Sequence, residues 1–105
     1  MSDFVFLYKG GSMPETDEAK AQVMAAWTGW FEQLGSAVKD GGNPFTPEGK
    51  QITSDGSVAD VGGTLASGYS IVEADSFASA LDIAKGCPVL QGGASIEVYE
   101  TFPVM

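Results

Sequence analysis

The 105-residue chain contains no histidine and no arginine, and its single cysteine is Cys87. A Ser-His-Asp or Cys-His catalytic site is excluded, because such sites need an imidazole to carry the proton. A zinc site built from His and Cys is excluded for the same lack of ligands. One cysteine also gives no internal disulfide, which is typical of a reducing compartment. We therefore expect a cytoplasmic protein without a metal centre.

Positive charge is scarce as well. Five lysines stand against 14 acidic residues, and the formal net charge is -9. Nucleic acid and anionic membrane surfaces attract basic patches, so neither is an expected partner. No apolar run approaches the roughly 20 residues of a transmembrane helix. The N-terminus Met1–Asp3 lacks the basic region of a secretory signal.

Motifs for common cofactors are missing. No two glycines stand two residues apart, so the dinucleotide-binding fingerprint is absent. Gly49-Lys50 is followed by Gln51, and position 44 is proline, so this segment is not a phosphate-binding P-loop. The EF-hand pattern is absent too. We expect no cofactor.

The length fits one domain, residues 1–105, and the 44% hydrophobic content favours a folded chain. The first helix is expected to begin at the cap Thr16 and carries an apolar stripe from Ala19 to Val38; Gly35 weakens or ends its last turn. The second helix follows the cap Asp75 or Ser76 and ends at Gly86. Apolar, β-branched runs and turn signals predict strands at 4–8, 50–54, 57–60, 68–74 and 95–101, with a hairpin turn at 55–56 and a loop at 40–49.

This order is β-α-β-(β)-β-α-β, which predicts an α+β, ferredoxin-like sandwich: an antiparallel sheet with two helices on one face. Strand 4–8 is apolar on both sides, with Phe4, Phe6 and Tyr8 on one face and Val5 and Leu7 on the other. Two helices cover only one face. A second copy is the economical cover for the other, so we expect a homodimer through sheet faces, a dimeric α/β barrel.

Several runs resemble one known family. They are Gly68–Ser76, Ala80–Pro88 and Gly92–Val98, together with Tyr8-Lys9-Gly10-Gly11 near the start. The chain resembles the YCII-related family, also called the DGPF-domain family, over most of its length. The resemblance implies a ferredoxin-like protomer, a dimeric α/β barrel and a bacterial cytoplasm. Most members have no assigned function; some resemble small enzymes for chlorinated aromatic compounds, and others accompany sigma factors.

The chain also departs from this family. A His-Asp pair is suggested as catalytic in part of it, and the absence of histidine prevents that pair from being carried over. The Asp-Gly-Pro-Phe motif is eroded and matches either Asp55–Val58 or Asp60–Gly63. An arginine that often follows Glu-Val near the end is Tyr99 here. The resemblance therefore supports the fold more than any activity.

The remaining candidates for chemistry are few. Asp40 or Asp60 would serve as a general base, with Tyr8, Tyr69 or Asn43 as a hydrogen-bond donor. Asp40 and Asn43, in the loop after the first helix, also suit ordinary turn chemistry. Trp27 and Trp30 share a helix face, and we expect Trp27 to lie deeper in the core. Trp30 is expected nearer an opening or the dimer contact, because Gly29 beside it leaves room on that side of the helix. A candidate ligand pocket comprises Tyr8, Trp27, Trp30, Asn43 and Tyr69.

Two functions remain open. The first is a homodimeric binding or accessory, regulatory protein with a small apolar pocket for an apolar or aromatic ligand; the loss of the histidine favours it. The second is a cofactor-independent enzyme of the dimeric barrel type that acts on a small aromatic or carbonyl compound with an Asp as base. The lack of arginine disfavours a strongly anionic ligand in either case, because nothing supplies a bidentate clamp.

Overall fold

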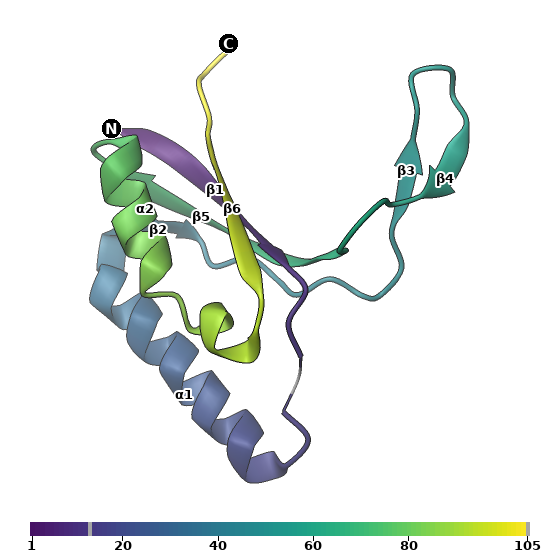
Figure 1. Cartoon of the computed structure of the whole chain (residues 1–105). Coiled ribbons are helices and arrows are strands. Elements are labelled where there is room, and N and C mark those ends of the chain that lie inside the picture. Colours follow the sequence, from purple (N-terminus) through teal and green to yellow (C-terminus); the bar gives the residue numbers. More distant parts are fainter. Residues whose placement is uncertain (13, 105) are drawn as a thin grey trace.

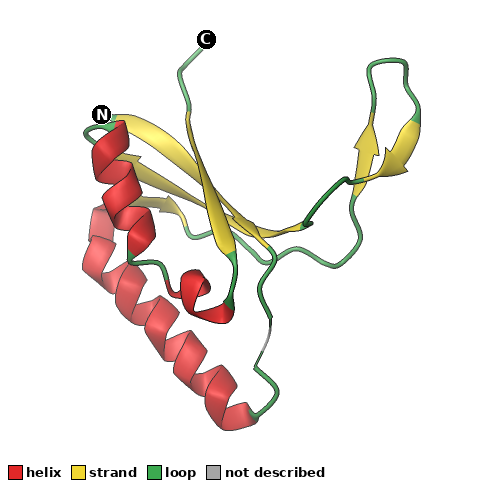
Figure 2. Ribbon diagram, viewed as in Figure 1, coloured by secondary structure: helices red, strands yellow, loops and turns green. Residues whose placement is uncertain are grey.

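The structure is a computed structural model that describes residues 1–12 and 14–104. A sheet is packed against two helices on one of its faces, and a two-stranded hairpin extends from it (Figures 1 and 2). Two short 3-10 helices, Gly35–Ala37 and Pro88–Gly92, connect the larger elements. In chain order, those elements are β1 (Ser2–Lys9), α1 (Asp17–Leu34), β2 (Val38–Asp40), β3 (Lys50–Ile52), β4 (Val58–Asp60), β5 (Ala66–Ala74), α2 (Phe77–Lys85) and β6 (Ser95–Glu100).

The main sheet has four antiparallel strands in the order β2-β5-β1-β6. Its central pair, β5 and β1, comes from segments far apart in the sequence, and each helix connects one central strand to an edge strand. This is the strand order of the split βαβ, ferredoxin-like arrangement. The predicted α+β class, with two helices on one face of an antiparallel sheet, is confirmed.

The second strand of this sheet differs from the prediction. Residues 50–54 were expected to fill that place, but β2 fills it and pairs Val38 with Val72 of β5. Gly35 ends α1 at a positive φ of 57°, and one 3-10 turn then releases the chain into an extended path. Val38 therefore belongs to a strand and not to the helical stripe. An edge strand of three residues is too short to show a period of its own.

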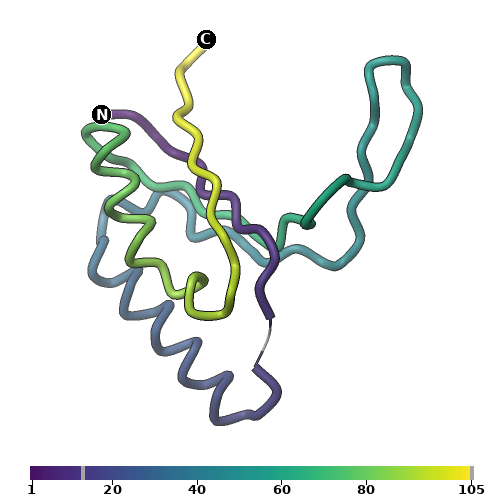
Figure 3. Tube along the Cα trace, viewed as in Figure 1, coloured from purple at the N-terminus to yellow at the C-terminus, as the bar shows by residue number. Residues whose placement is uncertain are grey.

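The predicted hairpin forms, but outside the main sheet. Lys50 pairs with Asp60, and Ile52 pairs with Val58, in a separate two-stranded ladder. The turn at Asp55-Gly56 uses a glycine with a φ of 88°, a conformation that side chains rarely adopt. We call Lys50–Asp60 the arm. Figure 3 shows it extending from one end of the sheet.

Both helices begin at the expected type of cap. The Thr16 hydroxyl accepts a hydrogen bond from the Ala19 amide at 3.1 Å. Ser76, the second of the two predicted alternatives, accepts one from the Ser79 amide, also at 3.1 Å. On α2 the small residues Ala80 and Ala84 are buried and let the helix approach the sheet closely.

The core lies between the helices and one face of the sheet. Phe4, Phe6 and Val72 are fully buried there, and Trp30 of α1 packs beside Phe6. The expected ranking of the tryptophans is wrong, because Trp30 is only 6% exposed while Trp27 is half-buried. The space beside Gly29 is solvent and not an opening into the core, because Gly29 is exposed and nothing lies within 4 Å of where its side chain would be. The indole of Trp30 instead lies over Gly86 after α2.

Candidate functional site

The face of the sheet away from the helices carries an ordered pattern of side chains. We call it the open face. Because Phe4, Phe6 and Tyr8 point toward the helices, their neighbours Val5 and Leu7 point away. Val5 and Leu7 each pair with one residue of β5 and one of β6, so that each lies in the middle of a row across three strands. The rows are Tyr69–Leu7–Glu97 and Ile71–Val5–Tyr99.

Asp40 and Tyr69 meet at one side of this face. Asp40 closes β2, and its carboxylate accepts a hydrogen bond from the Gly42 amide at 2.8 Å, which holds it in a turn. The Tyr69 hydroxyl donates to the other carboxylate oxygen at 3.4 Å, a long contact. The ring of Tyr69 stacks on Phe45, with centroids 5.8 Å apart and planes inclined by 24°. Asp40 and Tyr69, two candidates from the sequence that lie 29 residues apart, are therefore in contact.

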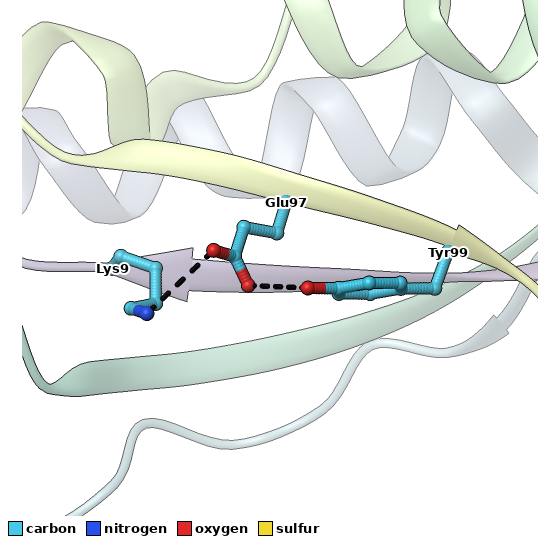
Figure 4. A network of polar contacts seen from close by, with 3 residues as sticks. All are labelled: Lys9, Glu97 and Tyr99. Atoms are coloured by element: carbon cyan, nitrogen blue, oxygen red, sulfur yellow. Dashed lines mark hydrogen bonds and ion pairs between the residues drawn. The ribbon is translucent and has the colours of Figure 1, made fainter. Parts of the chain in front are cut away.

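A second tyrosine–carboxylate pair lies at the other side of the open face (Figure 4). The Tyr99 hydroxyl donates to Glu97 at 2.7 Å, and the ammonium of Lys9 lies 3.6 Å from the other Glu97 oxygen. The hydrogen bond to the carboxylate raises the pKa of Tyr99, because Glu97 favours the phenol over the phenolate. Glu97 therefore offers an oriented acceptor beside a protonated phenol.

The open face combines aliphatic and polar chemistry. Val5, Leu7 and Ile71 form a half-buried aliphatic strip between the two tyrosine–carboxylate pairs. Carboxylates accept hydrogen bonds and tyrosine rings stack on flat molecules, so the pattern suits an aromatic compound with hydroxyl groups. The cations on this face are Lys9 and Lys39, and each already lies near an acid: Glu97 for Lys9 and Glu73, at 3.3 Å, for Lys39.

The other predicted acid lies elsewhere. Asp60 is on the arm, where its carboxylate accepts a hydrogen bond from Lys50 at 2.7 Å in a solvent-exposed ion pair. Asn43 is exposed in the loop after β2, next to Pro44, which forms a single bridge with Gly68 of β5. Asn43 therefore lies near Tyr69 along the strand, whereas Asp60 does not join Asp40 and Tyr69.

The remaining pocket candidates lie under the helices. Tyr8 pairs with Gly68 across the strands, so Tyr8 and Tyr69 point to opposite faces. The Tyr8 hydroxyl donates to Ser70 at 2.8 Å, and Ser70 donates to the Gly41 carbonyl at 2.8 Å. Burial raises the pKa of Tyr8 strongly. Trp27 packs edge-on against Tyr8, with centroids 5.5 Å apart, and against Trp30 at 5.7 Å. The sheet therefore separates these three residues from Tyr69.

Sequence reasoning missed Glu97, Tyr99 and Phe45 as site residues. A signal for the first two was present: they alternate with Ile96 and Val98, which pack on the core. A strand that places Ile96 and Val98 inward must place Glu97 and Tyr99 on the opposite face. Phe45 carried no comparable signal, because its loop brings it to Tyr69 only in the folded chain.

The cavity beside the arm and the thiol of Cys87 contribute little to a candidate functional site. A cavity of about 140 Å³ lies where the arm joins the sheet, with Phe45, Val61 and Leu65 in its wall. Cys87 is buried, and burial raises its thiol pKa, which disfavours the reactive thiolate. Residues 1–12 and 14–104 contain no cluster of three or more potential metal ligands. Among the described helices, none is long and apolar enough to cross a membrane.

Comparison with known proteins gives two findings. A sequence model described as the YCII-related domain matches residues 4–104, while no curated protein matches the chain. Among solved structures, 5-chloro-2-hydroxyhydroquinone dehydrochlorinase from Burkholderia phenoliruptrix, in complex with 2,5-dihydroxybenzoquinone, is similar, with a TM-score of 0.59 and 17% identity. The match covers 95% of this chain and 93% of that chain. At this identity the likeness establishes a shared fold.

Proposed function

Because the chain belongs to the YCII-related family, we propose that it is a homodimeric binding protein that holds a small hydroxylated aromatic compound on its open face. The observation that carries this proposal is the aliphatic strip of Val5, Leu7 and Ile71 between two tyrosine–carboxylate pairs. An accessory or regulatory role fits a site that binds without a histidine. The two parts of the proposal, the dimer and the ligand, have separate support.

The dimer is supported by the uncovered apolar strip. Within one chain the helices bury Phe4 and Phe6 completely, while Val5, Leu7 and Ile71 on the other side remain half-buried. Covering such a strip removes apolar area from water, at about 25 cal/mol per Å². A second copy presents the same strip and therefore offers a matching apolar surface. Two open faces turned toward each other, with the ligand between them, form the expected dimeric α/β barrel.

The ligand class follows from the polar groups at the margins. Glu97 and Asp40 accept hydrogen bonds, so the ligand must supply donors such as phenolic hydroxyls. The net charge of -9 and the absence of arginine disfavour an anion. The dehydrochlorinase of similar fold was solved with 2,5-dihydroxybenzoquinone, a flat six-membered ring bearing oxygen groups. We use hydroquinone as the probe compound.

Calorimetric titration with hydroquinone tests the ligand part. We expect saturable binding, and Glu97→Gln is expected to weaken it about tenfold, because a charge-assisted hydrogen bond is lost. Asp82→Asn, which removes an exposed acid on the far side of the sheet, is the matched control and leaves binding unchanged. Benzoate, an anion of similar size, is expected not to bind. Equal effects of both variants, or no heat from hydroquinone, would refute the open-face site.

A second function is favoured by the Tyr69–Asp40 contact. In this alternative the chain is a cofactor-independent enzyme in which Asp40 takes a proton from a hydroxylated aromatic substrate while Tyr69 orients the carboxylate. Loss of HCl from a chlorinated hydroquinone is one such reaction: the base takes one hydroxyl proton, a second hydroxyl proton moves to the ring carbon that bears chlorine, and chloride leaves with the electron pair of the C–Cl bond. The two hydroxyl oxygens thereby become the carbonyl oxygens of a quinone. Chloride release from 5-chloro-2-hydroxyhydroquinone that Asp40→Asn abolishes would establish the enzyme; binding without turnover would establish the binding protein.

A further inference from the structure

The arm is the one strand pair of the described residues that packs against no helix and joins no larger sheet. All six strand residues of the arm are exposed, including Ile52 at 71% and Val58 at 65%. These two residues pair directly, so they form one apolar patch on one side of the arm. An isolated two-stranded hairpin is marginally stable in water and needs a surface to pack on.

The arm is nevertheless held by hydrogen bonds and an ion pair among its own residues. The Asp55 carboxylate accepts a hydrogen bond from the Ser57 amide at 2.9 Å, and the Thr53 amide donates to the Ser57 carbonyl at 2.9 Å. The ion pair of Lys50 and Asp60 closes its other end. Its backbone and turn are thus satisfied, and what lacks a partner is the Ile52–Val58 patch. A preformed element of this kind loses little conformational freedom on binding.

The shape of the chain indicates what the arm meets. The radius of gyration is 15.1 Å, against about 13 Å for a compact chain of this length. The arm extends beyond the body of the sheet and rises beside the open face, on the side of the sheet away from both helices (Figures 1 and 3). A body seated on the open face would therefore lie alongside the arm.

The surface from the arm to the open face is also continuous. Val61 and Leu65, where the arm meets the sheet, line the same cavity as Phe45. Phe45 in turn stacks on Tyr69 of the open face. Apolar side chains thus connect the base of the arm to the site, so one bound body would contact both regions.

We propose that the arm clasps a second copy of this chain and packs Ile52 and Val58 against it. The inference rests on the dimer of the proposed function and adds to it a contact surface outside the sheet. In a two-fold dimer the contact occurs twice, once for each arm. The arm has one lysine against two acids, Asp55 and Asp60, so it lacks the basic patch that a nucleic acid needs.

The test compares two substitutions on opposite sides of the arm. Ile52→Asp places a charge in the patch, while Ala59→Asp places the same charge on the reverse side, since Ala59 pairs with Gln51. Both positions are exposed in the single chain, so far-UV circular dichroism and thermal melting should show both variants folded. Sedimentation over a dilution series then gives the monomer–dimer Kd of each.

We expect Ile52→Asp to weaken dimerisation by about 100-fold, roughly tenfold for each of two arms. Ala59→Asp should leave the Kd within about twofold of the original, because its side does not contact the partner. Equal weakening by both variants would assign the effect to charge alone and overturn the proposal. An unchanged Kd for Ile52→Asp would overturn it as well.

Ile71→Asp on the open face separates this inference from the proposed function. If Ile71→Asp abolishes the dimer and Ile52→Asp does not, the sheet-face dimer stands and the arm contact is wrong. If Ile52→Asp abolishes it and Ile71→Asp does not, the arm contact stands and the sheet-face dimer is wrong. A wild-type chain that stays monomeric at 100 µM, roughly the upper end of useful concentrations for weak dimers, would overturn both.

Discussion

The side chains on the two faces of one strand, β5, differ in how completely the chain buries them. Ser70 and Val72 are fully buried under the helices, and the one polar group among them, the Ser70 hydroxyl, both accepts and donates a hydrogen bond. Tyr69 and Ile71, their direct neighbours, stay half-buried on the open face. The chain completes the helix face by itself. The open face presents apolar and polar groups together, which is what a partner or a ligand requires.

This comparison predicts that substitutions on the helix face cost stability and that those on the open face change association or binding. The largest effect is expected at Trp30. Trp30→Ala should lower the free energy of unfolding by about 3–5 kcal/mol, and Trp27→Ala by roughly half as much, because Trp27 is only half-buried. Urea unfolding of both variants measures this. Equal losses would mean that exposure does not rank the two residues.

A smaller loss of folding stability is expected from a substitution at Ser70. Ser70→Ala removes the acceptor of the Tyr8 hydroxyl and the donor to the Gly41 carbonyl. Leaving such buried groups unpaired costs about 1–3 kcal/mol. The neighbouring change Tyr69→Phe should alter stability by less than about 0.5 kcal/mol while weakening hydroquinone binding. Urea unfolding and calorimetry on the same pair of variants check both halves, and a large stability loss in Tyr69→Phe would remove the contrast between the faces.

The two faces also differ in how their tyrosines titrate. Burial raises the pKa of Tyr8 above its ordinary value, so the folded state holds this proton more tightly than the unfolded state. Stability from Tyr8 is therefore fully present below about pH 10, the ordinary tyrosine pKa, and is lost as the pH rises above it. We expect the unfolding free energy of the wild type to fall above that pH. Tyr8→Phe should lower stability at neutral pH and flatten the alkaline fall; an equally steep fall in that variant would contradict this assignment.

Tyr99 on the open face should respond to a single neighbour. The pKa of its exposed hydroxyl is raised mainly by the hydrogen bond to Glu97, so Glu97→Gln should bring it back toward the ordinary value. Ultraviolet titration at the phenolate band follows this change, and Tyr99→Phe identifies which step belongs to Tyr99. Because the pair is exposed, folding stability should change very little. If the pKa of Tyr99 is the same in Glu97→Gln as in the wild type, the hydrogen bond to Glu97 is not what raises it.

Much of the architecture was available from short-range patterns. The 3.6-residue stripe and the caps Thr16 and Ser76 predicted both helices, and alternation predicted that Phe4, Phe6 and Tyr8 face one way and Val5 and Leu7 the other. These features depend on residues that are neighbours in sequence, so the sequence expresses them directly. The Asp55-Gly56 turn belongs to the same class, because one glycine at positive φ suffices to form it.

Other features depend on which distant segments meet. Val38–Asp40 becomes a strand only because β5 offers it an edge, and Lys50–Ile52, which had the better strand pattern, extends into the arm instead. Asp40 contacts Tyr69, which is 29 residues away in the sequence, while Asp60 lies on the arm and pairs with Lys50. The sequence by itself determined the helices, the alternation of the strands and the kinds of chemistry excluded. Only the tertiary structure decided which acid lies beside which tyrosine, because long-range pairing depends on the packing of the whole chain and not on any local pattern.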